Sequence, residues 1–307
     1  MSFLKQLFLF FIFLIAISLV CFILVNLSPN DPAEVALRVN DVVPTNEAIK
    51  QMREELGLDK PLFIRYFDWL KDISKADFGI SYITKTSVNE ELLKALPTTF
   101  YLSLFSLFLI ISLGLSFGIL CAIFEGSLFD KILRAITFVS MATPSFWLGL
   151  LLIWIFALHF NLFPTGGFES FSSIILPSIT LAFHNTATFV RLIRNSLIEN
   201  RETMFIYYAK ARGLKKVLIL KHQIKNALPT FLVALAMSIP KLLAGTVIVE
   251  NIFGLPGLGR LCIEAIFNRD YPIIQAYVLF MAVLFIFFNF ITDAYIKLTD
   301  PRLKEVR

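Results

Sequence analysis

Long apolar runs separated by polar segments constrain this chain more than any other feature. The first run, residues 7–27, carries no charged side chain. A helix needs about 20 mainly apolar residues to cross a hydrocarbon core of about 30 Å. A signal peptide has a shorter apolar stretch and a small-residue cleavage site, and no such site is evident here. We therefore expect residues 1–27 to form a retained first transmembrane helix.

Five further runs are long enough to span a bilayer, and they cover residues 100–123, 136–160, 174–193, 228–253 and 273–296. The composition agrees, because 57% of the residues are hydrophobic and only 17% are charged, against about 25% charged in a soluble domain. The mean hydropathy is +0.75. We expect an all-α integral membrane protein with six transmembrane helices, in which internal prolines mark kinks.

Residues 28–97 form a separate polar region, which we interpret as a small extramembrane subdomain. Pro44 and Thr45 precede Glu47, as at the start of a helix, and Gly57 is placed to end that helix. A second extramembrane element, a short re-entrant or interfacial helix, is expected within residues 254–272. Residues 98–307 then make up a five-helix core.

The basic residues predict the orientation of the helices. The segment between the fourth and fifth runs is rich in lysine and arginine, as cytoplasmic loops are. With six spans, both termini then lie in the cytoplasm and residues 28–97 lie outside. The basic residues of this segment are Arg191, Arg194, Arg201, Lys210, Arg212, Lys215, Lys216, Lys221 and Lys225.

This cytoplasmic loop, residues 198–227, is the most informative stretch. Gly213 can end one helix and start another at a sharp angle. Apolar residues at 217, 220 and 224 recur at helical spacing, which predicts a short amphipathic helix under the membrane. Such a helix is typical of a docking element for a partner protein. It is equally typical of an interfacial helix on anionic lipid.

The loop resembles the coupling loop of permeases from binding-protein-dependent ABC importers. In that family a glycine and a downstream Leu-Pro frame a helix that an ATPase subunit grips. Here Tyr207 stands where the family often has glutamate, and residues 213–222 are a residue or two shorter than usual, which leaves the helix register open. The residues that the resemblance assigns to ATPase coupling are Tyr208, Ala209, Ala211, Gly213, Leu228 and Pro229.

The resemblance covers nearly the whole chain and narrows the substrate class. Residues 30–33, 56–62 and 77–81 resemble the outer subdomain of nickel, dipeptide and oligopeptide permeases, as do residues 250–272 and the tail 300–302. The resemblance implies a type I ABC importer permease. It would form half of a path for nickel or a nickel chelate, with a dipeptide or oligopeptide as the alternative. It also implies a bacterial inner membrane, a second homologous permease, two ATPase subunits and a periplasmic solute-binding protein.

Polar residues inside apolar runs are candidates for the translocation path, because a charge at the bilayer centre costs about 2.5–3.5 kcal/mol. Lys241 and Glu250 are nine residues apart, about half a turn out of phase, so they cannot pair on a regular helix. Glu250 lines the path or pins an outer loop. The candidates are His184, Lys241, Glu250, Asn289 and Asp293.

The sequence lacks the motifs that are typical of several kinds of enzymes and metal sites. There is no phosphate-binding GxxxxGK[ST] loop, no catalytic triad pattern and no clustered metal-ligand spacing. We therefore expect no catalytic residues, no resident metal, no cofactor and no nucleic-acid partner, with ATP hydrolysis left to other subunits. An ion-gradient-driven secondary transporter is the rival from another class, although such folds usually carry inverted repeats and none is clear here.

Overall fold

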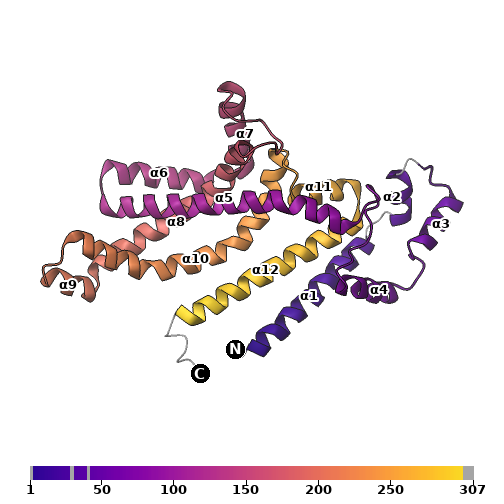
Figure 1. Cartoon of the computed structure of the whole chain (residues 1–307), viewed down its shortest axis with the longest axis horizontal. Coiled ribbons are helices and arrows are strands. Elements are labelled where there is room, and N and C mark those ends of the chain that lie inside the picture. The colour runs from indigo at the N-terminus through magenta and orange to yellow at the C-terminus, as the bar shows by residue number, and fades with distance from the viewer. Residues whose placement is uncertain (1–2, 28–30, 40–41, 300–307) are drawn as a thin grey trace. The chain divides into compact units, whose positions relative to one another are not determined.

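The computed structural model describes the backbone of residues 3–27, 31–39 and 42–299. Within these ranges the chain is helical and has no strand, apart from one isolated bridge between Ile80 and Ser87. It forms two compact units (Figure 1). Unit 1 comprises residues 1–98 and 256–287, and unit 2 comprises residues 99–255 and 288–307. The predicted all-α membrane architecture is confirmed.

Four helices are long and apolar enough to cross a membrane, and a bent pair makes a fifth segment. The shorter apolar stretch Phe10–Asn26 belongs to α1. The helices of the six predicted runs are α1 (Phe3–Asn26), α5 (Val88–Ile123), α6 (Leu128–Ala142) with α7 (Ser145–Leu152) and η1 (Ile153–His159), α8 (Ser172–Glu199), α10 (Lys216–Ile252) and α12 (Tyr271–Thr299).

The third run is bent by 110° between α6 and the α7–η1 segment. Thr143, which ends α6, has an extended backbone with ψ of 122°, and Pro144 follows it. Proline lacks the amide hydrogen that would continue the helix, and its ring pushes the preceding residue out of the helical region. The kink expected at Pro144 is therefore a complete break in the helix.

Unit 1 contains α1, the short helices α2 (Pro32–Val39), α3 (Asn46–Glu55) and α4 (Leu62–Ser74), and α11 (Leu258–Asn268). The predicted start of α3 is confirmed, because the Thr45 hydroxyl accepts a hydrogen bond from the Ala48 amide at 3.2 Å. Gly57 follows the helix with φ of +63°. The core of the unit packs α11 against the first part of α5, through Val88, Leu92 and Leu258 among others.

The helix expected within residues 254–272 is α11. Its buried side chains include Leu258, Cys262 and Ala265, whereas Ile266 and Phe267 are exposed. The outward apolar residues suit contact with a lipid interface.

Unit 2 is built around α8, which packs against α6, α7 and α10. Two glycines four residues apart, Gly114 and Gly118, bring α5 close to α8. A Cβ atom on Gly118 would lie 2.8 Å from the Cβ of Ile193, and one on Gly114 would lie 2.9 Å from the Cβ of Phe189. This small-residue spacing is the usual means of close helix packing in membranes.

Candidate functional site

A short helical elbow joins α8 to α10 in unit 2 (Figure 1). It consists of a 3₁₀ turn, η2 (Asn200–Glu202), and the eight-residue helix α9 (Met204–Ala211). Gly213 follows with φ of +72°, and the amides of Gly213 and Leu214 donate to the carbonyls of Lys210 and Ala209. This is the Schellman arrangement that terminates helices with glycine. The predicted sharp end at Gly213 is confirmed.

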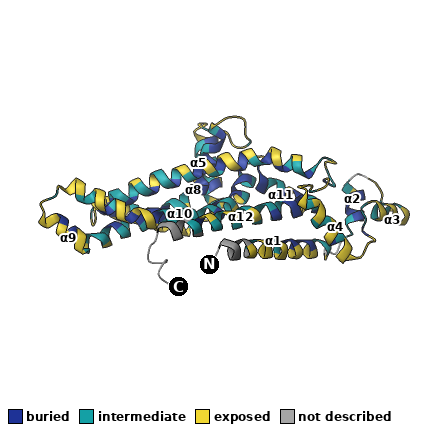
Figure 2. Cartoon of the chain, turned by 60° about the horizontal axis from the view of Figure 1, so that its bottom comes forward, coloured by how far each residue is buried: buried dark blue, intermediate teal, exposed yellow. Residues whose placement is uncertain are grey.

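The two faces of α9 differ in burial. Ile206 and Ala209 are buried against the rest of the unit. Met204 and Tyr208 are 84% and 66% exposed, and Tyr207 is also exposed (Figure 2). The Arg212 guanidinium lies 5.7 Å from the Tyr208 ring. The outer face of α9 is thus aromatic and basic, a composition that recurs at protein interfaces.

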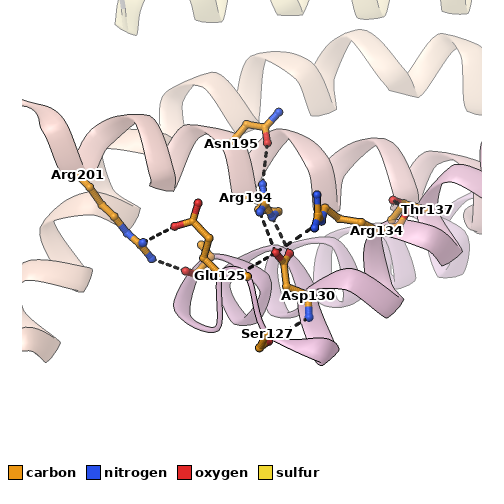
Figure 3. A network of polar contacts seen from close by, with 10 residues as sticks. Glu125, Ser127, Asp130, Arg134, Thr137, Arg194, Asn195 and Arg201 are labelled. Atoms are coloured by element: carbon orange, nitrogen blue, oxygen red, sulfur yellow. Dashed lines mark hydrogen bonds and ion pairs between the residues drawn. The ribbon is translucent and has the colours of Figure 1, made fainter.

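Polar contacts hold the elbow to neighbouring helices. Arg201 of η2 pairs with Glu125 at 2.6 Å and also donates to the carbonyl of Ala122, both at the turn between α5 and α6 (Figure 3). The Asn226 side chain on α10 donates to the Asn200 side chain at 2.9 Å. The elbow is therefore fixed on both sides, to the α5–α6 turn and to α10.

A second ion pair links α8 to α6 (Figure 3). Arg194 donates two hydrogen bonds to Asp130, with Nε–Oδ1 at 2.7 Å and Nη2–Oδ2 at 2.9 Å. The Asp130 side chain is fully buried and also accepts from the Gly126 amide, while Arg134 lies 3.6 Å away. Such a bidentate buried pair is geometrically specific. It makes the ends of α6 and α8 move together.

Sequence reasoning missed both ion pairs. Arg194 and Arg201 counted only toward the basic character of a loop, whereas the structure gives each a carboxylate partner more than sixty residues away in sequence. Nothing local connects them. The only local signals were two acidic residues, Glu125 and Asp130, in the short charged segment before the third apolar run.

The prediction of a separate short amphipathic helix after Gly213 is wrong. Residues from Lys216 onward belong to α10, which continues unbroken to Ile252 through Pro229. Val217 is exposed, whereas Gln223 and Ala227 are buried. Leu228 and Pro229 therefore lie within a long helix and do not delimit a separate one. The short helix of this region is α9, before the glycine, which carries Tyr208, Ala209 and Ala211.

The path candidates lie in different environments. His184 on α8 and Lys241 on α10 are exposed. Glu250 is fully buried and accepts a hydrogen bond at 2.7 Å from the Thr99 hydroxyl. Lys241 and Glu250 are expected to lie on different faces of their helix, and the difference in their burial agrees with this. Asn289 is half-buried on α12, and the side chain of Asp293 lies outside the described ones.

Most residues of α8 are at least partly buried, but one face of the helix carries a stripe of polar side chains. His184, Thr188, Arg191 and Asn195 recur at spacings of four, three and four, so they share one helix face. His184, Arg191 and Asn195 are exposed and Thr188 is half-buried. Such side chains on a membrane helix face water or another protein, because lipid would not satisfy them.

Metal-binding groups are sparse in the part of the chain that the structure describes. No group of three or more histidine, cysteine, aspartate or glutamate side chains there could hold a metal ion. The three cysteines, Cys21, Cys121 and Cys262, are buried and free.

This arrangement of apolar helices defines a class of membrane transport subunit. Solved structures of ABC importers share the fold: an inward-facing MetNI methionine ABC transporter gives a TM-score of 0.57 at 17% identity, over 68% of this chain and 96% of that one. An amino acid ABC transporter solved with histidines gives 0.54 at 17% identity, over 68% and 94%. The fold is that of an importer permease.

Two family models match the sequence. Residues 114–305 match the binding-protein-dependent transport system inner membrane component, and residues 1–103 match the N-terminal part of such membrane components. The chain belongs to this family. It is a multi-pass membrane protein, and the family implies an ATPase and a solute-binding protein as partners.

Curated relatives match along nearly the full length. The metal-staphylopine import system permease protein CntB of Staphylococcus aureus is 34% identical over 98% of this chain and 97% of its own length. The oligopeptide transport system permease protein AppB of Bacillus subtilis is 33% identical, over 95% of each chain. The predicted resemblance to metal and peptide importer permeases is confirmed.

Proposed function

We propose that this chain forms half of the translocation path for nickel, or a nickel chelate, in an ABC importer driven by partner ATPases. The substrate would arrive from a periplasmic binding protein, and a second homologous permease would complete the path. Both termini and the α9 elbow would face the cytoplasm. ATP hydrolysis would belong to two partner subunits.

The observation that carries the proposal is the exposed face of α9 on an elbow that is anchored to neighbouring helices. A partner that grips Met204 and Tyr208 would apply force directly to α8 and α10, because η2 is held by Arg201 and Asn226. The Asp130–Arg194 pair would carry that displacement to α6. Rigid elements joined in this way support alternating access by movement of packed helices.

The polar stripe on α8 supports a water-filled path beside that helix. His184, Thr188 and Arg191 would then contact the solute or its hydration shell. Lys241 is exposed on α10 on the same face as Met237 and would face the second permease. Glu250, with its buried hydrogen bond to Thr99, fits a role in pinning helix ends better than one in solute contact.

Metal transport is favoured by the motifs shared with nickel permeases and by a relative named for metal-staphylopine import. That name pairs the metal with a companion molecule, which supports a complex over a bare ion. Oligopeptide transport is the second candidate, because a relative of nearly equal identity is named for it.

Uptake into vesicles that contain the assembled importer separates these substrates. We expect radiolabelled nickel to accumulate with ATP inside, either alone or with a chelator, and vanadate to block it. Accumulation of a labelled dipeptide instead would assign the chain to the peptide class. Uptake that a proton gradient drives without ATP would remove the importer assignment.

Gly213 provides the test of coupling. A side chain at φ of +72° strains the backbone by about 1–2 kcal/mol, although no atom lies within 4 Å of a Cβ placed there. We expect Gly213→Val to tilt α9, to lower substrate-stimulated ATPase activity and uptake severalfold, and to leave membrane insertion unchanged. Gly57→Val is the matched control, since Gly57 also has a positive φ and open surroundings but belongs to unit 1 and not to the elbow or its anchors. Normal uptake by Gly213→Val would count against the coupling role.

A further inference from the structure

Unit 1 contains a cavity of about 930 Å³ that the importer mechanism does not use. This volume is in the range of small-molecule sites, which is about 300–1,000 Å³. Aromatic side chains from four elements line it: Phe22 of α1, Trp69 of α4, Phe78 and Tyr82 of the following loop, and Tyr271 of α12. The cavity is thus a concave site within a single unit, lined by both aromatic and charged side chains.

A cation without an ionic partner lies in the wall of this cavity. The Arg65 guanidinium packs 5.9 Å from the centre of the Phe22 ring. Within the described part of the chain it has no ion pair and no hydrogen-bond acceptor. Two other cations of unit 1 are paired, Lys60 with Asp68 at 2.9 Å and Arg53 with Asp31 at 2.7 Å, whereas Lys71 and Lys85 on the cavity wall are exposed to solvent.

Arg65 is partly buried, so the absence of an ion pair among the described residues leaves its charge poorly solvated. Partial burial lowers the pKa of Arg65, because the loss of water outweighs the attraction of the Asp31 carboxylate and Arg53 repels the charge. A guanidinium in such surroundings suits a planar anion, which it binds through two parallel hydrogen bonds. The four acidic side chains on the wall are exposed to solvent, and one of them, Asp68, pairs with Lys60; the others are Glu55, Asp72 and Asp77.

A buried carboxylate holds the part of the wall that contains Ser81 and Tyr82. Asp270 accepts hydrogen bonds from the Ser81 hydroxyl and from the Tyr82 amide, the latter at 3.2 Å, and is almost fully buried. These bonds hold the turn that presents Tyr82. Burial raises the pKa of Tyr82 to about 12, so its hydroxyl stays protonated at neutral pH. Tyr82 is therefore a protonated phenol held near Arg65.

We propose that this cavity binds a small organic carboxylate, with Arg65 paired to the carboxylate group and the aromatic wall around the rest of the molecule. The exposed acidic side chains would suit an amino group at the other end, which favours free amino acids and short peptides. The inference uses only unit 1 and holds whether or not the elbow couples to an ATPase.

Fluorescence of Trp69 provides the test on the full-length protein in lipid nanodiscs. Trp147→Phe and Trp154→Phe leave Trp69, which lines the cavity, as the reporter. The probes are alanyl-alanine, its C-terminal amide and free alanine. We expect a saturable response to alanyl-alanine and at least tenfold weaker binding of the amide. Comparing alanine with alanyl-alanine shows which size of carboxylate the cavity favours.

Single substitutions distinguish binding at Arg65 from nonspecific changes in the fluorescence of Trp69. Arg65→Gln should weaken alanyl-alanine binding at least tenfold and abolish the preference over the amide, whereas Arg65→Lys should lose less. Tyr82→Phe should weaken binding by a few fold. Lys50→Gln removes an exposed cation of α3 outside the cavity and should change nothing. No saturable response in the parent protein, equal binding of the dipeptide and its amide, or unchanged binding by folded Arg65→Gln would each overturn the proposal.

Discussion

Helices α8 and α10 are both long enough to cross a membrane, yet unit 2 uses them differently. Of the most apolar stretch in each, 61% of residues are buried in α8 and only 22% in α10. The residues that α8 leaves exposed are largely polar, as in the stripe from His184 to Asn195. From Phe231 onward, three of the four exposed residues of α10 are apolar, namely Met237, Ala244 and Ile248, and the fourth is Lys241.

The difference assigns distinct roles to the two helices. α8 is packed against α5, α6, α7 and α10, and its exposed face is mainly polar, as the proposed water-filled path requires. α10 offers an apolar face that suits lipid or a second permease. The elbow joins the two helices, and a partner bound there would act on both at once.

The largest expected effect comes from removing the ion pair that fixes α8 to α6. Replacing one member of a buried pair leaves the other charge unsatisfied and costs about 3–5 kcal/mol. We expect Asp130→Ala and Arg194→Ala each to lower the free energy of unfolding by this amount. SDS-induced unfolding in mixed micelles, followed by circular dichroism, measures it.

Arg134→Ala is the matched control for that measurement. Its guanidinium lies 3.6 Å from Asp130 and its side chain is 53% exposed, so its loss should cost less than about 1 kcal/mol. Equal effects of Arg134→Ala and Arg194→Ala would show that the bidentate pair does not hold the helices together.

A smaller effect is expected from two glycine-to-alanine changes on opposite sides of α8. At Gly118 a Cβ would lie 2.8 Å from the Cβ of Ile193 and 3.1 Å from the carbonyl oxygen of Val190, so α5 and α8 must separate. We expect Gly118→Ala to destabilise the protein by about 1–3 kcal/mol, measured in the same unfolding assay.

Gly245→Ala tests the α10 side of the comparison. Its Cβ would meet only the terminal Cδ1 of Leu181, at 3.0 Å, and that methyl group can rotate away. Alanine also favours a helix by about 0.5–1 kcal/mol over glycine. The change should therefore be neutral or slightly stabilising. A loss as large as that of Gly118→Ala would mean that α10 is held as tightly as α8.

Cysteine substitutions that test the polar stripe of α8 are expected to affect stability least. The three native cysteines are first replaced by alanine. Thr188→Cys on α8 should then react with a charged, membrane-impermeant thiol reagent when the path is open to the side of the membrane where the reagent is added. Met237→Cys on the apolar face of α10 should react at least about tenfold more slowly, because lipid or a partner covers it and a thiolate does not form there. Similar rates at both positions would remove the distinction between the two helices.

The sequence predicted the apolar runs well but not how far the helices extend beyond them. Hydropathy detects only lipid-compatible residues, so the polar beginnings of α5, from Val88, and of α10, from Lys216, were not assigned to those helices. The break at Pro144 was expected only as a kink, because the sequence does not reveal whether neighbours restore the freed backbone bonds. The cap at Thr45 and the turn at Gly57 were predictable because their signals are local.

The site was less predictable than the fold. Gly213 and the basic residues around it marked the elbow, because helix termination and charge are local properties. A separate short helix was nevertheless predicted on the wrong side of the glycine, since the apolar spacing after it also fits the first turns of α10. The pairs Asp130–Arg194 and Glu125–Arg201 depend on tertiary packing that brings distant segments together.

Cross-linking of the elbow to the ATPase tests the central claim most directly. In the assembled importer without native permease cysteines, Tyr208→Cys on α9 should cross-link to the ATPase subunit, and Ser170→Cys, just before α8 begins, should not. Cross-linking of the ATPase at Ser170→Cys, or labelling of Tyr208→Cys by an impermeant reagent added outside intact cells, would contradict the account.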